Sequence, residues 1–260
     1  MTVLVVTGAA SGMGRACVER LRERADHVLA VDLEAPEIDG TVGVACDVSN
    51  PSAVARLADE VRQRGAFKGL VHAAGISPTM GEVRRVFEVD LVGTQLVLDA
   101  FEPLVEPGSA AVCFASSSAY QVVLLGPDPK LDALVEDPRV DRFLDRAEAA
   151  FDNSGVAYAW AKRGVIRAAA RAAVSWGRSG GRVNSLSPGL IDTGMGRQEF
   201  ELQPIMQVML DNTPLGRLGR ADEAAALAAY LLSDDASFVS GIDVLMDGGM
   251  LEGFRGIVSR

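Results

Sequence analysis

Tyr158 and Lys162 stand four residues apart in the stretch Tyr-Ala-Trp-Ala-Lys. On a helix this spacing puts both side chains on one face, with their Cβ atoms about 5–6 Å apart. An ammonium group at that distance favours the anionic form of a phenol and lowers its pKa. Such pairs also arise by chance on solvated helices, so other residues must decide whether this pair does acid–base chemistry.

A glycine-rich turn near the start of the chain is a second candidate for chemistry. Residues 3–6 form a mostly β-branched run that predicts a buried strand, and residues 15–24 predict a helix. Between them, Gly8, Gly12 and Gly14 would let backbone N–H groups approach a pyrophosphate at the helix N-terminus, where the helix dipole favours negative charge. We therefore predict a dinucleotide site here; a tight turn without a ligand is the alternative.

Asp32 ends the second predicted strand, roughly 20 residues beyond the glycine turn. A carboxylate there can accept hydrogen bonds from the adenosine ribose hydroxyls and would repel a 2′-phosphate. Neither Ser11 nor Leu33 supplies a compensating cation, so NAD is favoured over NADP. A solvated aspartate at a strand end is the alternative. Asp47, after the third strand, could face the adenine or merely cap the helix that Pro51 begins.

Strand-like and helix-like segments alternate along the whole chain. This alternation predicts an α/β fold: a Rossmann-type doubly wound parallel sheet of about seven strands, with helices on both faces. Ligands of such sheets bind beyond the carboxyl ends of the strands. The residues at those ends are Thr7, Asp32, Gly75, Ser117 and Pro188. The expected strands are residues 3–6, 27–31, 41–45, 68–72, 110–115, 182–186 and 243–246; the expected helices are 15–24, a segment from 51, 84–101, a segment through 158 and 162 to about 177, and 221–232.

Composition limits the class of protein. The chain has 260 residues, a formal charge of −10 and a pI near 4.8, which argues against a nucleic-acid or anionic-membrane partner. No apolar run approaches the roughly 18–20 residues that span a bilayer, and no signal peptide precedes the first strand. Cys17, Cys46 and Cys113 lie in apolar contexts typical of reduced core residues, and two histidines are too few for a histidine-rich metal site. We expect a soluble, cytoplasmic, single-domain protein without a metal.

Several short motifs follow one another along the chain: Thr7-Gly8, Gly12-Met13-Gly14, Asp32, Asp47, Ala74-Gly75, Ser117, Tyr158…Lys162, Asn184, Pro188-Gly189 with Thr193, and Asp247-Gly248-Gly249. Each motif is weak alone, but their order and spacing together are specific. Over nearly its whole length the chain thereby resembles the short-chain dehydrogenase/reductase family. The resemblance implies NAD(H)-dependent interconversion of an alcohol and a ketone.

The resemblance also implies roles in catalysis. Tyr158 would be the general acid/base that exchanges a proton with the substrate oxygen. Lys162 would hold the nicotinamide ribose and lower the pKa of Tyr158. Ser117 would hydrogen-bond the reacting oxygen and stabilise its developing charge. Ser116 and Ser118 compete for that role, and we prefer Ser117 because it aligns with the second serine of the family's Ser-Ser pair.

The cofactor-binding residues follow from the same resemblance. Backbone around Leu190 and the Thr193 hydroxyl would position the carboxamide. The family's Asn-Asn-Ala-Gly motif is reduced here to the stretch from His72 to Gly75, which puts its side-chain contacts in doubt but not its backbone role. The full expected set is Gly8, Ser11, Gly12, Met13, Gly14, Asp32, Asp47, Val48, Ala74, Gly75, Tyr158, Lys162, Pro188, Gly189, Leu190, Ile191 and Thr193.

Asp90 is a departure from the family. The usual residue there is an asparagine that holds a water molecule of the proton relay, and an aspartate can also accept a hydrogen bond from that water. Its charge could also pair with Lys162 and weaken the effect of the lysine on Tyr158. We therefore expect a more alkaline optimum for oxidation than in an Asp90→Asn variant.

A long segment, residues 119–153, is the larger departure, because it separates Ser117 from Tyr158 by 41 residues. Asp137-Pro138 resembles an N-cap and first helical position. We predict a folded helical insertion docked on the domain, as in the bacterial 3α-hydroxysteroid dehydrogenase/carbonyl reductase type. In that group the insertion covers a surface that other members use for oligomer contacts, which implies a homodimer more than a tetramer. The apolar residues at helical spacing are Val140, Phe143, Leu144, Ala147 and Phe151.

Residues 190–210 should lie over the nicotinamide, as the substrate loop of the family does. Their apolar side chains either pack on the core or form an adaptable lid, for which methionine is well suited. No cluster of Arg or Lys accompanies them, which argues against phosphorylated or acidic substrates. Tyr120 and Val122 are further candidates for the pocket lining. The apolar side chains are Met195, Phe200, Leu202, Ile205, Met206, Met209 and Leu210.

We expect a hydrophobic alicyclic secondary alcohol or ketone as substrate, with 3α-hydroxysteroids among the candidates. The alternatives are a general carbonyl reductase, a dehydrogenase of a non-steroid alcohol, or a catalytically silent NAD-binding regulator.

Overall fold

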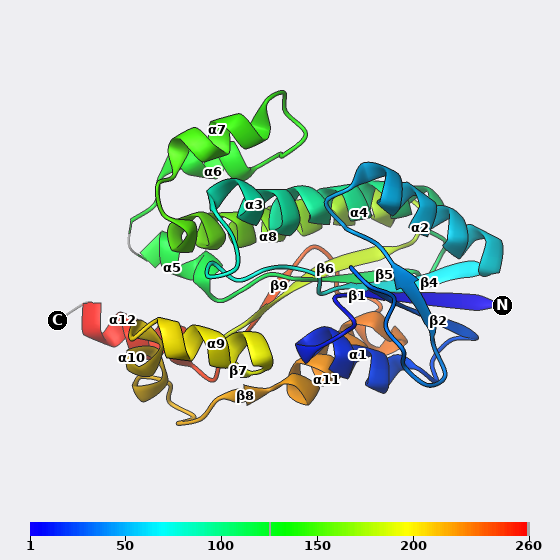
Figure 1. Cartoon of the computed structure of the whole chain (residues 1–260). Coiled ribbons are helices and arrows are strands. Elements are labelled where there is room, and N and C mark those ends of the chain that lie inside the picture. The colour runs from blue at the N-terminus through cyan, green and yellow to red at the C-terminus, as the bar shows by residue number, and fades with distance from the viewer. Residues whose placement is uncertain (125, 259–260) are drawn as a thin grey trace.

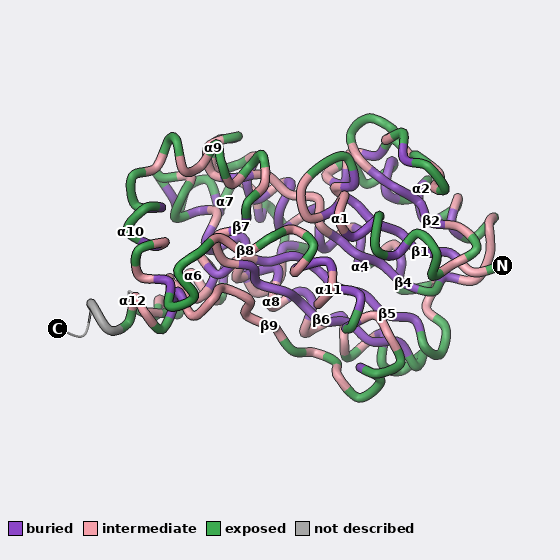
Figure 2. The backbone as a smooth tube through the Cα atoms, turned by 90° about the horizontal axis from the view of Figure 1, so that it is seen from below, coloured by how far each residue is buried: buried purple, intermediate pink, exposed green. Residues whose placement is uncertain are grey.

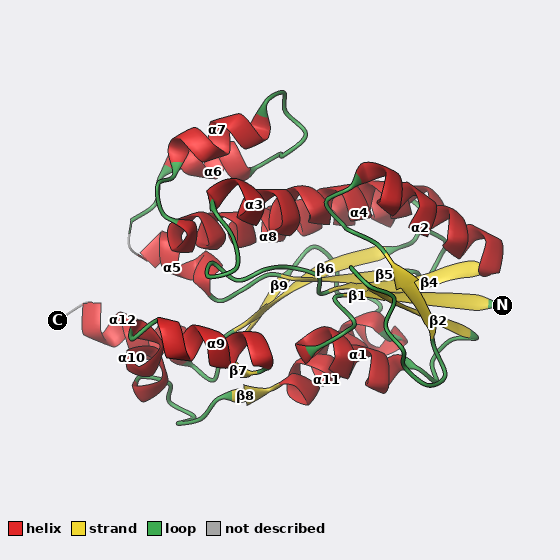
Figure 3. Cartoon of the chain, viewed as in Figure 1, coloured by secondary structure: helices red, strands yellow, loops and turns green. Residues whose placement is uncertain are grey.

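The computed structural model of the protein describes residues 1–124 and 126–258 and is built on a seven-stranded parallel sheet (Figure 3). The strand order is β3-β2-β1-β4-β5-β6-β9, so the chain winds outward from β1 in both directions. This is the doubly wound arrangement, and the predicted fold class is confirmed. The strands are β1 (Thr2–Thr7), β2 (His27–Asp32), β3 (Val42–Ala45), β4 (Ala66–His72), β5 (Ala110–Phe114), β6 (Arg182–Pro188) and β9 (Asp243–Met246).

Helices cover both faces of the sheet (Figure 1). On one face lie α2, α4 and α8, and on the other lie α1 and α11. The two-residue strands β7 (Ile191–Asp192) and β8 (Gly219–Arg220) form a separate parallel pair. The helices are α1 (Gly12–Leu21), α2 (Pro51–Arg64), α3 (Val83–Val86), η1 (Phe87–Val92), α4 (Gly93–Phe101), η2 (Glu102–Leu104), α5 (Ser118–Leu124), α6 (Pro129–Val135), α7 (Phe143–Ala150), α8 (Ser154–Arg178), α9 (Gly194–Leu202), α10 (Ile205–Asp211), α11 (Ala221–Leu232), η3 (Asp234–Ala236) and α12 (Met250–Val258). None of the helices among the described residues has the length and apolarity to cross a membrane.

The central strands are buried on both sides, as Figure 2 shows in purple. Along β1, Val3 and Val5 pack into the core beneath α2, α4 and α8, whereas Leu4 and Val6 pack against α1 and α11. Successive strand residues point to opposite faces, so a strand covered on both faces must be apolar throughout. This requirement explains the unbroken apolar run at the start of the sequence.

The first helix starts earlier than predicted. It begins at Gly12 instead of residue 15, after Ser11 in extended conformation, and it ends at Leu21 instead of residue 24. The first turn of a helix has backbone N–H groups without intrahelical partners. Gly12 and Gly14 lie inside this first turn, and because β1 ends at Thr7 its free N–H groups sit near the carboxyl edge of β1.

The helix predicted over residues 84–101 is interrupted. A π-helical turn, η1, separates the short α3 from α4. Such turns are frequent at functional sites, and this one carries Asp90. Apolar periodicity does not distinguish a π turn from an α-helical one over so few residues, so the sequence did not reveal it.

Residues 119–153 contain α6, α7 and all of α5 except its first residue. The expectation that Asp137-Pro138 starts a helix is wrong, because the Asp-Pro pair that does so is Asp128-Pro129, which starts α6. The Asp137 carboxylate instead accepts a hydrogen bond from the Arg139 N–H at 3.0 Å and closes a turn. Both pairs carry the same local signal, and only the tertiary packing separates them.

Helices α6 and α7 pack on the rest of the molecule through apolar side chains and ion pairs. Phe143 of α7 meets Phe87 edge-on, with ring centroids 5.7 Å apart, whereas Val140 lies outside the helix and is 41% exposed. On α6, Asp132 accepts hydrogen bonds from Arg163 of α8, and Glu136 just after α6 pairs with Arg171. The other predicted apolar positions of this segment, Leu144, Ala147 and Phe151, belong to the same cluster as Phe143.

Candidate active site

Two cavities adjoin at the carboxyl edge of the sheet. The smaller, of about 290 Å³, runs along the glycine turn and is called the groove below. The larger, of about 590 Å³, lies between α5, the start of α8 and the helices α9 and α10, and is called the large cavity. Tyr158 and Thr193 line both, so they stand where the two meet.

Most residues expected to bind a cofactor line the groove. Pro188, Gly189, Leu190 and Ile191 line the large cavity instead. Two more residues that line the groove belong to segments that the sequence suggested, Ala73 in the stretch from His72 to Gly75 and Met195 in residues 190–210. Several of the remaining lining residues are chain neighbours of expected residues, but no signal marks Met80 or Arg85. The residues that the sequence did not suggest are Val31, Leu33, Cys46, Ile76, Met80, Arg85, Val89, Phe114, Ala115 and Gly194. The expected residues that line the groove are Gly8, Ser11, Gly12, Met13, Gly14, Asp32, Asp47, Val48, Ala74, Gly75, Tyr158, Lys162 and Thr193.

The glycine turn is so tight that side chains are excluded. Gly8 has a φ of +70°, and a Cβ there would lie 2.7 Å from the carbonyl group of Ala73. A Cβ on Gly14 would lie 2.0 Å from the Gly8 oxygen. The turn therefore needs glycine at both positions, and it brings the N-terminus of α1 against the end of β4.

His72 and Thr7 support the floor of the groove. Thr7 Oγ1 lies 2.8 Å from His72 Nδ1 and accepts a hydrogen bond from the Ala74 N–H at 3.2 Å. Burial and the charge of Lys162 lower the pKa of His72 to about 3, so the imidazole is neutral. No role for this histidine was predicted from the sequence; through Thr7 it supports the backbone that leads to Gly75.

Asp32 and Asp47 lie at the far end of the groove. The Asp32 carboxylate accepts hydrogen bonds from the N–H groups of Ala10 at 2.9 Å and Leu33 at 2.8 Å. Asp47 does not cap α2, since the Asn50 side chain does so. Burial would raise the pKa of Asp47, but hydrogen bonds from Ser49 and the nearby charge of Arg85 outweigh it and hold that pKa below its usual value.

Tyr158 and Lys162 lie on one face of α8, as their spacing predicts. Lys162 Nζ is 5.6 Å from the centroid of the Tyr158 ring. The lysine is 6% exposed and donates to the Phe114 carbonyl oxygen at 3.3 Å. Its other contact is Asp90, whose Oδ1 lies 3.4 Å from Nζ.

The side chain of Asp90 is buried beside Lys162. Its Oδ1 accepts a hydrogen bond from the Ile76 N–H at 3.0 Å, and its Oδ2 has no hydrogen-bond partner among the described residues. Burial raises the pKa of Asp90, while the Lys162 charge opposes this. A Cβ on Gly75 would lie 2.6 Å from Asp90 Oδ1, so only glycine lets the groove reach this pair.

The electrostatic surroundings of Tyr158 work against its ionisation. Burial raises the pKa of Tyr158, and the charges of Asp90 and Glu199 raise it further. A hydrogen-bonding interaction with the Ser116 hydroxyl lowers it. The predicted effect of Asp90→Asn depends on this contribution of Asp90 and stays a prediction.

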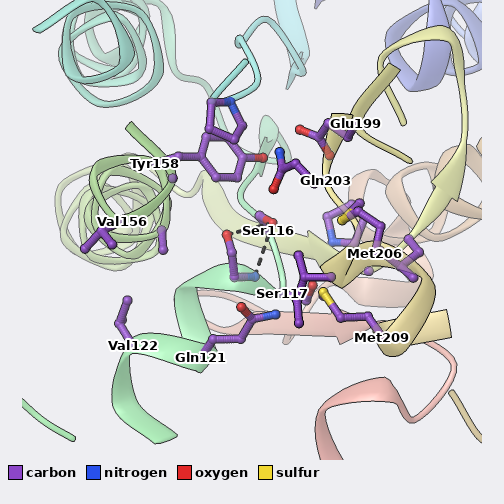
Figure 4. Close-up of a pocket in the computed structure, with 18 of the residues that line it drawn as sticks. Ser116, Ser117, Gln121, Val122, Val156, Tyr158, Glu199, Gln203, Met206 and Met209 are labelled. Atoms are coloured by element: carbon purple, nitrogen blue, oxygen red, sulfur yellow. Dashed lines mark hydrogen bonds between the residues drawn. The ribbon is translucent and has the colours of Figure 1, made fainter. Parts of the chain in front are cut away.

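The serine run places Ser116, rather than Ser117, beside the tyrosine hydroxyl (Figure 4). Ser116 Oγ accepts hydrogen bonds from the Ser118 N–H at 3.2 Å and from the Ser118 hydroxyl at 3.0 Å. With both acceptor positions filled, its own proton is free to point at Tyr158 or at a bound oxygen. The geometry therefore supports Ser116 over the preferred Ser117. Ser117 lines the same cavity and donates its backbone N–H to the Pro188 oxygen at 2.8 Å.

The large cavity has a mostly apolar wall from the segment expected to form a lid. Met206 and Met209 form a buried cluster with Met250 and also line the cavity, so packing and lid roles coincide. Leu202 is exposed, and Leu210 does not line the cavity. Val122 does line it. The expectation for Tyr120 is wrong, because its hydroxyl turns away to donate to Asp243 at 2.6 Å. The other expected members that line the cavity are Met195, Phe200 and Ile205.

Comparison with known proteins agrees with this geometry. A solved structure of the 3-alpha-hydroxysteroid dehydrogenase from Pseudomonas sp. B-0831 complexed with NADH superposes with a TM-score of 0.80 at 30% identity, covering 98% of this chain and 99% of that one. The 3-alpha-hydroxysteroid dehydrogenase/carbonyl reductase of Comamonas testosteroni is 26% identical, with 96% of both chains covered. The cis-4-hydroxycyclohexanecarboxylate dehydrogenase of Sinomonas cyclohexanicum is 32% identical, with 95% of both chains covered.

A family model also matches most of the sequence. It is described as enoyl-(acyl carrier protein) reductase and matches residues 8–126 and 144–251, leaving out the stretch that contains α6. The matched ranges contain the glycine turn, the serine run and the Tyr158–Lys162 pair. The chain belongs to the short-chain dehydrogenase/reductase family.

Proposed function

We propose that the protein is an NAD-dependent oxidoreductase that interconverts a hydrophobic secondary alcohol and its ketone. The observation that carries the proposal is the position of Tyr158, which lines both the groove and the large cavity, with Lys162 behind it and Ser116 beside it. An alcohol in the large cavity and a nicotinamide in the groove would thus meet at the tyrosine hydroxyl.

The groove fits a dinucleotide. Its glycine turn admits no side chain at Gly8 or Gly14, so backbone N–H groups at the start of α1 can receive a pyrophosphate. Asp32 stands where the adenosine ribose would lie, and its carboxylate would repel a 2′-phosphate. The related 3-alpha-hydroxysteroid dehydrogenase complexed with NADH supports the same cofactor. When bound, the nicotinamide supplies the hydride acceptor or donor.

The chain's own residues would handle the proton. In alcohol oxidation, the Tyr158 phenolate would take the hydroxyl proton of the substrate as general base. In ketone reduction, the Tyr158 phenol would donate a proton to the substrate oxygen. Lys162 would favour the ionised form and offer its remaining N–H to a ribose hydroxyl. The Ser116 hydroxyl would hydrogen-bond the reacting oxygen as its charge develops.

The lining of the large cavity favours an apolar substrate. Among its described residues no Lys, Arg or His appears, whereas Asp128 and Glu199 do, so an anionic substrate would meet only like charges. Two related proteins named for 3-alpha-hydroxysteroids support an alicyclic alcohol, 3α-hydroxysteroids included. The relative named for cis-4-hydroxycyclohexanecarboxylate supports a ring alcohol, but its named substrate also carries a carboxylate, which Asp128 and Glu199 of this cavity would repel. A general carbonyl reductase is the second candidate, since one relative carries that name too.

Tyr158→Phe tests the catalytic assignment against a catalytically silent NAD-binding regulator. Removing the hydroxyl should lower kcat for alicyclic alcohols with NAD by about 10²–10⁴-fold, the usual contribution of a general acid/base. NADH binding, followed by protein fluorescence, should persist. If the unaltered protein oxidises or reduces nothing in a panel of steroid and simple cyclic alcohols and ketones, the regulator gains and the proposal fails.

A pair of serine variants decides which hydroxyl acts. Ser116→Ala should lower kcat by about 10²–10³-fold, as expected for loss of a donor to a developing oxyanion. Ser117→Ala should retain most of the activity, because the described contacts of Ser117 are made by its backbone. The reverse order of the two variants would restore Ser117 to the role expected from the sequence.

Asp90→Asn tests the electrostatic effect of the buried carboxylate. Oxidation requires ionised Tyr158, so its rate rises with pH through the pKa of this tyrosine. Asp90 raises that pKa, and removing its charge should therefore move the rising limb of kcat/KM to lower pH. Coincident pH profiles for the two proteins would show that Asp90 does not act on Tyr158.

We also propose that the protein forms a homodimer through the free edge of β9. The outer face of α8 is covered by α6, to which it is tied by the Arg163–Asp132 ion pair. In contrast, β9 is the last strand of the sheet, and the segment before it carries Phe238, which is fully exposed, and Ile242, which is 47% exposed. Exposed large apolar side chains beside a free strand edge are typical of a contact surface.

Phe238→Ser should therefore shift the protein from dimer to monomer in size-exclusion chromatography with light scattering. Val140→Ser, at an exposed apolar position between α6 and α7, is the matched control and should stay dimeric. A dimer that survives Phe238→Ser would place the interface elsewhere.

A further inference from the structure

Asp128 and Glu199 are the charged side chains among the described residues of the large cavity, and both are carboxylates. They differ in how many of their hydrogen-bond acceptor positions the protein itself uses. Asp128 accepts hydrogen bonds from the N–H groups of Lys130 and Leu131 and so caps α6. Glu199 on α9 makes no ion pair with any described residue. A carboxylate has roughly four lone-pair positions for hydrogen bonds, so Glu199 can accept from a ligand.

Glu199 faces the reacting end of the cavity. It stands four residues before Gln203, and Figure 4 shows both side chains reaching from this part of the chain toward the Tyr158 hydroxyl. Its charge raises the pKa of Tyr158, which agrees with that proximity. Burial raises the pKa of Glu199 itself, opposed by the hydroxyl of Ser77 and the charge of Lys162.

Once a substrate displaces water from the cavity, the Glu199 carboxylate needs hydrogen-bond donors from the substrate. The large cavity that Glu199 lines has a mostly apolar wall, to which Phe200 and Met206 of the lid segment contribute. A half-buried carboxylate in such a wall loses part of its hydration when a substrate fills the cavity. Leaving it without a new partner costs free energy, so a site of this kind discriminates against ligands that cannot donate.

We propose that Glu199 selects substrates that carry a second hydroxyl near the reacting carbon. The preferred class is then a cyclic diol or a hydroxyketone, and a hydroxy acid is rejected by charge. This inference rests on the function proposed above, since it concerns the substrate of the same site. Gln203 assists, because its amide can also bond the second hydroxyl.

The experiment compares cyclohexanol with the 1,2-, 1,3- and 1,4-cyclohexanediols and with 2-hydroxycyclohexanecarboxylate, using NAD and the full chain. For the best diol, kcat/KM should exceed that for cyclohexanol by about 10- to 100-fold, the size expected for a hydrogen bond to a charged group. The ratio is the readout because both alcohols react through Tyr158, so any change in its pKa cancels.

Two variants of Glu199 separate recognition from lid structure. Glu199→Leu should bring the ratio close to one, and Glu199→Gln, which keeps an acceptor but not the charge, should give an intermediate ratio and admit the hydroxy acid. Glu201→Gln removes the same charge from an exposed position of α9 outside the cavity and should leave the ratio as it is.

The outcomes distinguish the two proposals. If the unaltered protein oxidises cyclohexanol without preferring any diol, or if Glu199→Leu keeps the ratio, the selection by Glu199 is overturned and the oxidoreductase stands. If Glu199→Leu lowers both activities by the same factor, the residue only shapes the lid and the inference is also overturned. If no alcohol of any kind is oxidised, the proposed function itself fails.

Discussion

The site is arranged around the contacts that compensate the buried ammonium group of Lys162. Removing a charged group from water costs several kcal/mol unless other groups replace its hydration. Here the replacements are the Phe114 carbonyl oxygen at 3.3 Å and Asp90 Oδ1 at 3.4 Å. Both contacts are longer than the roughly 2.7–2.9 Å of a strong charge-assisted hydrogen bond. The lysine is thus compensated but loosely held, which leaves donor capacity directed at the groove.

This compensation constrains the surrounding backbone. Asp90 reaches Lys162 from a π-helical turn, and the end of β4 must pass beside the pair. A side chain at Gly75 would collide with Asp90, and one at Gly8 would collide with Ala73. The small residues at the carboxyl ends of β1 and β4 therefore meet one requirement. The backbone there has to leave room for the groove and for the buried Lys162–Asp90 pair at the same time.

Asp90 makes the compensation different from that of an amide at the same place. An asparagine would offer an acceptor without a charge, whereas the carboxylate places a negative charge beside Lys162 and near Tyr158. The pKa of Tyr158 is then set by a balance: burial, Asp90 and Glu199 raise it, and the Ser116 hydroxyl lowers it. Two of these groups, Ser116 and Glu199, come from parts of the chain far from the Tyr158–Lys162 helix.

The sequence predicted those features that depend on local spacing and failed on those that depend on packing. Period-2 burial, the glycine turn and the four-residue Tyr158–Lys162 spacing follow from backbone geometry, so the sheet and the groove were predictable. Which of Ser116 and Ser117 faces Tyr158 depends on how the three-serine run leaves β5. Which of Asp128 and Asp137 starts a helix depends on which segment packs against the rest of the protein. Tyr120 points away from the cavity because Asp243, 123 residues later, accepts its hydroxyl. No local pattern contains such contacts.

The polarity of the large cavity links these points to specificity. An apolar stripe in residues 190–210 predicts only that the substrate is hydrophobic, and Met206 and Met209 of that stripe line the large cavity. The carboxylate of Glu199 interrupts the apolar surface of the lid segment where that segment faces Tyr158. A charge there opposes ionisation of Tyr158. Such a cost to catalysis is offset only if the same charge binds something in the reacting complex, and a donor on the substrate is the partner that the geometry leaves open.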